Sequence, residues 1–173
     1  MTALVIGASA SGKSEYAEAL ALKFGLPRYY IATMQPFGEE GEKRILRHRL
    51  MREGKGFFTI ERYLDIGALK LPQRGTALLE CVGNLVANEL FSSGGSRENT
   101  VESIIGGISA LEKQCENLII VTNDIFSDGI EYDSETESYI KALGLVNSKT
   151  ACLCNLAVEI VCGIPIAVKG VLP

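Results

Sequence analysis

Hydrophobic positions along the chain fall into short apolar runs separated by longer segments of helical periodicity. Seven runs predict strands, at Ala3–Ile6, Tyr29–Ala32, Phe57–Ile60, Ala77–Val82, Leu118–Asn123, about Val158–Cys162 and Ile166–Lys169. The intervening apolar spacing predicts helices at Lys13–Phe24, Val82–Phe91, Glu98–Glu116 and Ser134 to about Leu156, the last interrupted by Gly144. Strands that alternate with helices predict one α/β domain over residues 1–173, with a mainly parallel sheet covered on both faces.

Polar residues and glycine stand where several of these strands end. Gly7, Thr33, Glu80 and Asn123 each lie at the carboxyl end of a predicted strand. Ligands of open parallel sheets bind at that edge. We therefore expect these four residues to gather around one site.

The first strand leads directly into a phosphate-binding pattern. Gly7, Gly12, Lys13 and Ser14 match G-x-x-x-x-G-K-S, after a strand and before a helix. Small residues let successive backbone N–H groups point at one anion, and the helix amino terminus adds its dipole. Lys13 supplies charge to the outer phosphates, whereas Ser14 and the strand-ending acid Glu80 are candidate ligands of Mg²⁺. This pattern predicts a nucleotide site.

A strongly basic segment, residues 43–55, follows a loop at Pro36–Gly41. Six of its thirteen residues are Lys or Arg, and it holds His48, the only histidine of the chain. On a helix, Arg44, His48 and Arg52 share a face, while Ile45, Leu46 and Leu50 supply apolar contacts. One interpretation is a solvated basic helix. The other is a nucleophilic histidine, because neighbouring positive charge lowers an imidazole pKa and also holds the attacked phosphate.

Composition narrows the class of protein. The chain has 173 residues, 47% of them hydrophobic, and a net charge of −4, which argues against general nucleic-acid binding. We expect a cytoplasmic protein with no membrane span and no signal peptide. The five cysteines are expected to be reduced core residues, with helix packing favoured over a metal site for Cys152 and Cys154. Ser134 and Glu137 have the spacing of a capping box.

The sequence closely resembles the bifunctional adenosylcobinamide kinase/adenosylcobinamide-phosphate guanylyltransferases of cobalamin biosynthesis. The resemblance runs nearly end to end and depends on the order and spacing of several segments. These are Gly7–Ser14, Tyr30-Ile-Ala-Thr33, Arg44-Ile-Leu-Arg-His48, Thr59-Ile-Glu61, Leu78-Leu-Glu-Cys81, Asn88, Val121-Thr-Asn123 and Gly163-Ile-Pro165.

This resemblance implies a two-step enzyme with a recombinase-type P-loop fold that assembles as a trimer. The first step phosphorylates adenosylcobinamide with ATP or GTP; the second transfers GMP from GTP to the new phosphate through a guanylyl-histidine. The catalytic positions fall on His48 and Lys13, and Mg²⁺ on Ser14 and Glu80. The family's nucleotide contacts fall on Gly7, Ala8, Ser9, Ala10, Ser11, Gly12, Lys13, Ser14, Thr33, Met34, Gln35, Arg49, Leu50, Met51, Arg52, Glu61 and Glu80.

The chain departs from the family pattern in its last third. The loop Asp124–Asp133 is acidic and lacks proline, and the sequence also differs near Ile140-Lys141 and at Asn147-Ser148. These departures bear on corrinoid and subunit contacts. Two alternatives to the bifunctional enzyme stay open: a P-loop kinase for another small hydroxyl compound, in which His48 only binds phosphate, and a non-catalytic nucleotide switch.

Overall fold

The computed structural model of the chain describes residues 1–36, 38, 46, 50, 52–126 and 129–173. Within them one sheet is formed by β1 (Thr2–Gly7), β2 (Arg28–Ala32), β3 (Phe57–Glu61), β4 (Thr76–Glu80), β5 (Asn117–Asn123), β6 (Leu156–Val161) and β7 (Ile164–Lys169). The helices are α1 (Lys13–Leu22), α3 (Val82–Phe91), α4 (Thr100–Gln114) and α5 (Ser134–Leu153), with 3₁₀ turns η1 (Ile66–Ala68) and η2 (Arg97–Asn99).

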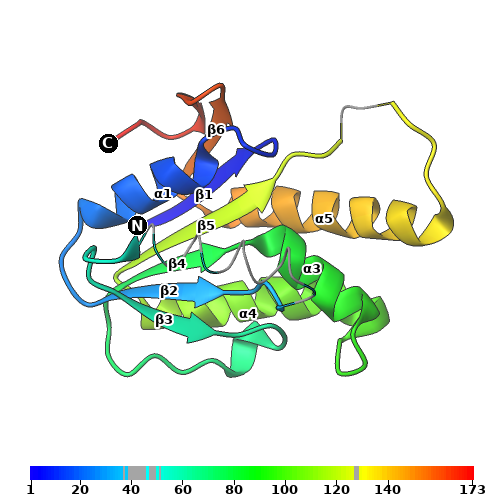
Figure 1. The fold of residues 1–173 in the computed structure, drawn as a ribbon, viewed down its shortest axis with the longest axis horizontal. Helices are drawn as coiled ribbons and strands as arrows, with labels where there is room; N and C mark the ends of the chain where they lie inside the picture. Colours follow the sequence, from blue (N-terminus) through cyan, green and yellow to red (C-terminus); the bar gives the residue numbers. More distant parts are fainter. Residues whose placement is uncertain (37, 39–45, 47–49, 51, 127–128) are drawn as a thin grey trace.

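The strand order is β3-β2-β4-β5-β1-β6-β7 (Figure 1). Every neighbouring pair is parallel except β6 and β7, which form an antiparallel hairpin. The strand β5 lies between β1, which leads into the phosphate loop, and β4, which ends at Glu80. The chain therefore has the predicted α/β P-loop fold with a mainly parallel sheet, and an antiparallel strand is added at one edge.

Helices cover both faces of the sheet, as predicted. On one face α1 packs Ala17 and Leu20 against inward side chains such as Val5 and Ile119. On the other face α3, α4 and α5 bury a larger cluster that includes Leu85. Alternate residues of a strand point to opposite faces, so the central strands are apolar at nearly every position.

The register brings the carboxyl ends of the strands together. Gly7 pairs with Asn123, and Ala32 pairs with Glu80. The backbone N–H of Thr33 donates to the carbonyl of Glu80 over 2.9 Å. The expected gathering of Gly7, Thr33, Glu80 and Asn123 is confirmed.

Tertiary contacts move two predicted helix ends. The helix α1 ends at Leu22 instead of Phe24, and the Arg28 guanidinium caps this end by donating to the carbonyls of Ala21 and Leu22 and to the Phe24 carbonyl just beyond them. The helix α5 ends at Leu153, three residues early, because Leu156 already pairs with β1. Lys169 caps this end by donating to two of its carbonyls over 3.0 Å each.

Two details predicted for α5 are wrong. Its N-cap is Asp133, whose carboxylate accepts from the Thr136 backbone N–H over 2.8 Å, so Ser134 is already the first helical residue and forms no capping box. The helix also continues through Gly144 without interruption. A Cβ at Gly144 would lie 3.5 Å from the Phe126 ring, which is an ordinary van der Waals contact.

Exposure corrects two further expectations. Cys81, Cys115 and Cys154 are buried core residues, but Cys152 and Cys162 are exposed. All five thiols are free, and burial raises the pKa of both Cys115 and Cys154 to about 12. Leu46 and Leu50, expected to make apolar contacts, are 57% and 59% exposed. In the described ranges, no helix has the length and apolar character that a membrane crossing requires.

Candidate functional site

A cavity of about 570 Å³ opens at the carboxyl edge of the sheet, within the size range of small-molecule sites. The loop between β1 and α1 forms one wall, with Ser9 to Ser14 in succession. The loop is tightly wound: the Ser11 N–H donates to the Ala8 carbonyl over 3.2 Å, and Gly12 has a φ of +92°. The left-handed backbone at the start of α1 explains why the pattern needs glycine at position 12.

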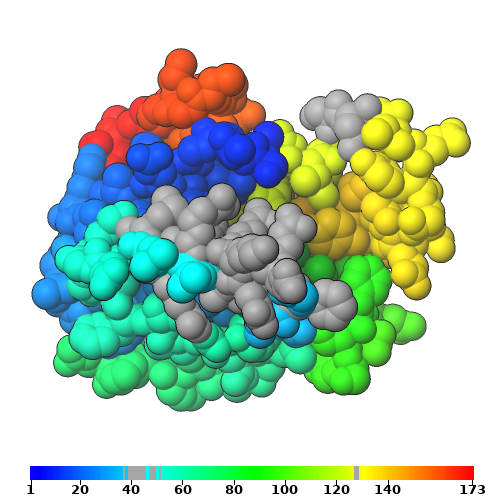
Figure 2. Space-filling model, viewed as in Figure 1, coloured from blue at the N-terminus to red at the C-terminus, as the bar shows by residue number. Residues whose placement is uncertain are grey.

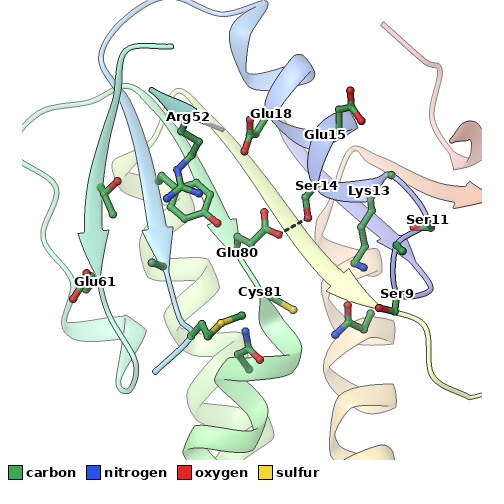
Figure 3. Close-up of a pocket in the computed structure, with 18 of the residues that line it drawn as sticks. Ser9, Ser11, Lys13, Ser14, Glu15, Glu18, Arg52, Glu61, Glu80 and Cys81 are labelled. Carbon is green, nitrogen blue, oxygen red and sulfur yellow. Dashed lines mark hydrogen bonds between the residues drawn. The ribbon is translucent and has the colours of Figure 1, made fainter. Parts of the chain in front are cut away.

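Lys13 lies inside this wound loop. Its ammonium donates to the Ala8 carbonyl over 3.0 Å, and its side chain is only 9% exposed. In this position a compact positive charge faces the space enclosed by the loop (Figure 3). The arrangement suits the outer phosphates of a nucleotide, which would replace a single backbone carbonyl as the partner of the charge.

Glu80 reaches across the cavity floor to the first turn of α1. The Ser14 hydroxyl donates to Glu80 Oε1 over 2.5 Å, shown as a dashed line in Figure 3. The other carboxylate oxygen, Oε2, is buried without a hydrogen-bond partner among the described residues. Burial raises the pKa of this carboxyl, and the Ser14 hydrogen bond opposes the rise only in part. The sheet therefore holds a carboxylate ready to accept a further cationic ligand.

These oxygens fit Mg²⁺, which prefers oxygen ligands and commonly takes one or two carboxylates together with substrate phosphates. The orphaned Oε2 of Glu80 and the Ser14 hydroxyl lie side by side, next to the loop that would hold those phosphates. Among the residues described, no group of three or more His, Cys, Asp or Glu could hold a metal by itself. The donor set thus matches a metal that arrives with its nucleotide.

The opposite wall carries a second cation. The Arg52 guanidinium lies 3.3 Å from the centroid of the Tyr30 ring, and both side chains are buried. Neither Nε nor Nη1 of Arg52 has a hydrogen-bond partner in the described part of the chain. Figure 3 shows Arg52 across the cavity from Lys13. Two cations on opposite walls suit an elongated polyphosphate between them.

An ion pair connects the end of the basic segment to α1. Lys55 Nζ lies 2.7 Å from Glu18 Oε2, and Glu18 is buried on the cavity side of the helix. The Arg28 guanidinium also donates to the Lys55 carbonyl over 3.4 Å. The carboxyl end of the basic segment is thereby held beside the helix that follows the phosphate loop.

The cavity brings together most of the predicted nucleotide contacts. Its lining includes Ser9, Ala10, Ser11, Gly12, Lys13, Ser14, Met34, Arg52, Glu61 and Glu80. Other predicted contacts do not line it: Gly7, Ala8, Thr33, Gln35 and Leu50. His48, Arg49 and Met51 lie outside the described residues, as does most of the predicted basic helix.

Thr33 has a structural role that the sequence does not reveal. Its side chain is fully buried, and its hydroxyl bridges the backbone at the end of β4. It lies 3.0 Å from the Glu80 carbonyl and 2.8 Å from both the carbonyl and the N–H of Cys81. Thr33 thus fixes the backbone that carries Glu80.

Several cavity residues were not predicted as site residues. They are Glu15, Glu18, Tyr30, Ala32, Thr59, Tyr63, Cys81, Asn84 and Ile125. Glu18 could have been found, because it lies one helical turn after Ser14 and so shares its face. Tyr30 could not have been found in this way, because the sequence pattern of an aromatic residue in a buried strand is the same whether or not the ring contacts a cation.

Comparisons with known proteins agree with this geometry. The family model for "Cobinamide kinase / cobinamide phosphate guanyltransferase" matches residues 3–168. The chain is 31% identical over 184 residues to the bifunctional adenosylcobalamin biosynthesis protein CobU of Escherichia coli K12, covering 98% of this chain and 100% of that protein. It is 28% identical over 174 residues to the CobP protein of the same description from Pseudomonas aeruginosa, covering 98% of each.

A solved structure also aligns with the chain. The flagellar accessory protein FlaH from Methanocaldococcus jannaschii aligns with a TM-score of 0.43 and 12% sequence identity. The alignment covers 98% of this chain and 78% of that one.

Proposed function

Because the chain belongs to the cobinamide kinase/cobinamide phosphate guanyltransferase family of cobalamin biosynthesis, we propose that it carries out both of the reactions for which the family is named. In the first, adenosylcobinamide is phosphorylated on its aminopropanol hydroxyl by ATP or GTP. In the second, GMP passes from GTP to the new phosphate through His48, giving adenosylcobinamide-GDP and pyrophosphate. The observation that carries the proposal is the cavity with Lys13, Ser14 and Glu80 on one side and Arg52 on the other.

The kinase step uses the phosphate loop. The substrate hydroxyl oxygen attacks the γ-phosphorus, the bond to the β–γ bridging oxygen breaks, and the nucleoside diphosphate leaves. Lys13 neutralises charge on the outer phosphates, and the loop N–H groups hold them in place. Ser14 and Glu80 would hold Mg²⁺, which offsets charge on the phosphate oxygens when bound.

The transferase step uses His48. An imidazole nitrogen attacks the α-phosphorus of GTP and pyrophosphate leaves; the cobinamide phosphate then attacks the same phosphorus, and the phosphorus–nitrogen bond breaks. Splitting one displacement into two in this way is a general advantage of covalent catalysis. Chain connectivity supports the assignment: His48 precedes the cavity residue Arg52 by four residues, which span at most about 14 Å of extended backbone.

Two variants separate the steps. With α-labelled GTP, the wild-type protein is expected to retain acid-labile, alkali-stable label after denaturation, and His48→Ala to retain none. His48→Ala should keep at least part of its ATP-dependent phosphorylation of adenosylcobinamide. Lys13→Ala should lower that phosphorylation by at least about 10²-fold, the effect typical of removing one group that stabilises transition-state charge.

The controls define what would contradict the proposal. Lys23→Ala removes a lysine at the far end of α1, where its ammonium bonds the Pro173 carbonyl, and should leave both activities intact. If the wild-type protein takes up no covalent label but still phosphorylates a hydroxyl compound, it is a P-loop kinase only. Turnover of neither nucleotide with cobinamide would leave a non-catalytic nucleotide-binding protein.

We further propose that the enzyme works in the cytoplasm as a homotrimer. Two exposed free thiols, Cys152 and Cys162, suit a reducing compartment. The edge strand β7 exposes Ile164, Ile166 and Val168, an apolar set that association of subunits would cover.

A further inference from the structure

The turn of the carboxyl-terminal hairpin lies against the outer side of the phosphate loop. The Gly163 backbone N–H donates to the Ser11 carbonyl over 2.9 Å, although the two residues are far apart in sequence. In Figures 1 and 2 the orange hairpin lies beside the blue amino-terminal segment. Neither Cys162 nor Gly163 lines the nucleotide cavity, so the turn touches the loop from behind.

The geometry of the turn makes this donor well defined. Val161 pairs with Ile164 across the hairpin, so Cys162 and Gly163 form a two-residue connection. Their φ angles are +51° and +80°, the left-handed pair of a type I′ turn. Such a turn matches the twist of its strands, and it holds the Gly163 N–H in one direction.

Further contacts support the same approach. A side chain at Gly12 would lie 3.4 Å from the Gly163 Cα and 3.8 Å from the Ile160 side chain. A side chain at Gly7 would lie 2.8 Å from the Ile160 carbonyl oxygen. The end of β6 and the hairpin turn therefore pack along both glycines of the phosphate loop.

The hydrogen bond to Ser11 also orients a donor of the phosphate site. The peptide between Ser11 and Gly12 is planar and trans, so its C=O and N–H point in opposite directions. Holding the Ser11 carbonyl toward the hairpin therefore directs the Gly12 N–H toward the inside of the loop, where a phosphate would lie. We propose that Gly163 is a positioning residue, whose backbone N–H holds the Ser11–Gly12 peptide in its phosphate-binding orientation.

This proposal rests on the nucleotide-binding part of the proposed function, and it predicts a specific change in nucleotide affinity. Without the Gly163 donor, the Ser11–Gly12 peptide can rotate, and the free protein must lose that freedom when nucleotide binds. Nucleotide affinity should fall by the value of about one hydrogen bond, which is about five- to tenfold in Kd. The folded sheet should change little, because the ladder between β6 and β7 keeps its own hydrogen bonds.

The position of Cys162 allows the donor to be deleted alone. Residues 162–173 can be made as a synthetic peptide that begins with cysteine and joined by native chemical ligation to residues 1–161. Replacing Gly163 by glycolic acid turns its N–H into an ester oxygen and leaves every side chain unchanged. The controls are the all-amide ligation product and a product whose single ester replaces the N–H of Val171, which lies beyond the last strand.

The measurements are calorimetric Kd values for ATP with Mg²⁺ and unfolding temperatures without nucleotide. We expect the Gly163 ester to raise the Kd about five- to tenfold over both controls and to unfold at the same temperature as the Val171 ester. An unchanged Kd, with or without a lower unfolding temperature, would overturn the positioning role. If the all-amide protein itself binds neither ATP nor GTP, the proposed function fails instead.

Recombinant variants provide a second measurement. A side chain at Gly163 meets no atom within 4 Å, so substitutions there act through the backbone. Asn tolerates a left-handed backbone and keeps the N–H, so Gly163→Asn should retain ATP affinity. Val is strongly disfavoured at positive φ, so Gly163→Val should raise the Kd at least as much as the ester. Equal affinities of the two variants would contradict the proposal.

Discussion

At the scale of single residues, Glu80 shows how the fold prepares a site at the expense of stability. Its carboxylate is buried beside Ser14, and one of its oxygens has no partner among the described residues. A buried charge without full compensation is unfavourable, as the raised pKa of this carboxyl indicates. If Glu80 holds Mg²⁺ as proposed, the bound cation would supply the partner that this oxygen lacks.

The variant Glu80→Gln tests whether the buried carboxylate lowers the stability of the folded protein. The folded pKa of Glu80 is raised above its unfolded value, so the stabilising contribution of the neutral acid is present at low pH and is lost as pH rises through the folded pKa. The variant stays neutral throughout. We therefore expect Glu80→Gln, relative to wild type, to gain resistance to urea unfolding as the pH is raised above 4.5 in the absence of metal and nucleotide.

The same variant should lose activity. The rate of phosphorylation should fall at least about 10- to 100-fold, because changes to the surroundings of a metal site typically have an effect of that size. Glu15→Gln, which neutralises an exposed carboxylate lining the same cavity, is the matched control and should show neither effect. The stability of Glu80→Gln and of wild type could instead differ by the same amount at every pH. That result would show that ionisation of Glu80 does not destabilise the folded protein.

At the scale of secondary-structure elements, the start of α5 is an example in which the sequence pattern predicted one N-cap residue and the structure shows another. Asp133 accepts from the backbone N–H and the hydroxyl of Thr136, and these hydrogen bonds lower the pKa of its carboxyl. The sequence favoured Ser134 because of Glu137 three residues later. Both residue types are good N-caps, so the pattern alone could not choose between them.

Variants of the two residues have different expected outcomes. Asp133→Ala should lower the unfolding temperature by a few degrees at pH 7, whereas Ser134→Ala and Asp133→Asn should lower it less. The lowered pKa means that the charged cap stabilises above the unfolded pKa of aspartate and is lost as pH falls through the folded value. The difference between Asp133→Ala and wild type should therefore shrink below about pH 4. A larger effect at Ser134 would reinstate the capping box.

At the scale of the whole molecule, the strand order explains why distant segments form one site. β1 and β4 hold the phosphate loop and Glu80, and β5 separates them. The hairpin β6–β7 returns to the outer side of the same loop. We propose that residues 1–173 form one domain around this sheet, and we therefore expect a single cooperative unfolding transition.

The proposed trimer is tested by molar mass. Light scattering on the eluting protein should give three times the single-chain mass of 18.7 kDa, independent of concentration over the micromolar range. Association would cover exposed apolar side chains such as Phe58 on the edge strand β3 and Ile164 on β7. A mass of 18.7 kDa at all concentrations would contradict the trimer.

The features that could be predicted from the amino-acid sequence are those that local interactions control. The phosphate loop, the seven strands and the meeting of Gly7 and Glu80 at one sheet edge were predicted, because glycine placement and apolar periodicity act over a few residues and parallel sheets bind ligands at one edge. Likewise, the order of short motifs along the chain indicated the family.

How side chains from distant segments complete the candidate site could be seen only in the folded protein. The stacking of Arg52 on Tyr30, the burial of Thr33 and the bond from Gly163 to Ser11 join residues that are distant in sequence. The hydrogen bond from Arg28 to the Leu22 carbonyl at the end of α1 likewise became visible only in the structure. Such contacts depend on strand order and packing, which local residue patterns do not encode, so they become visible only when the sheet is assembled.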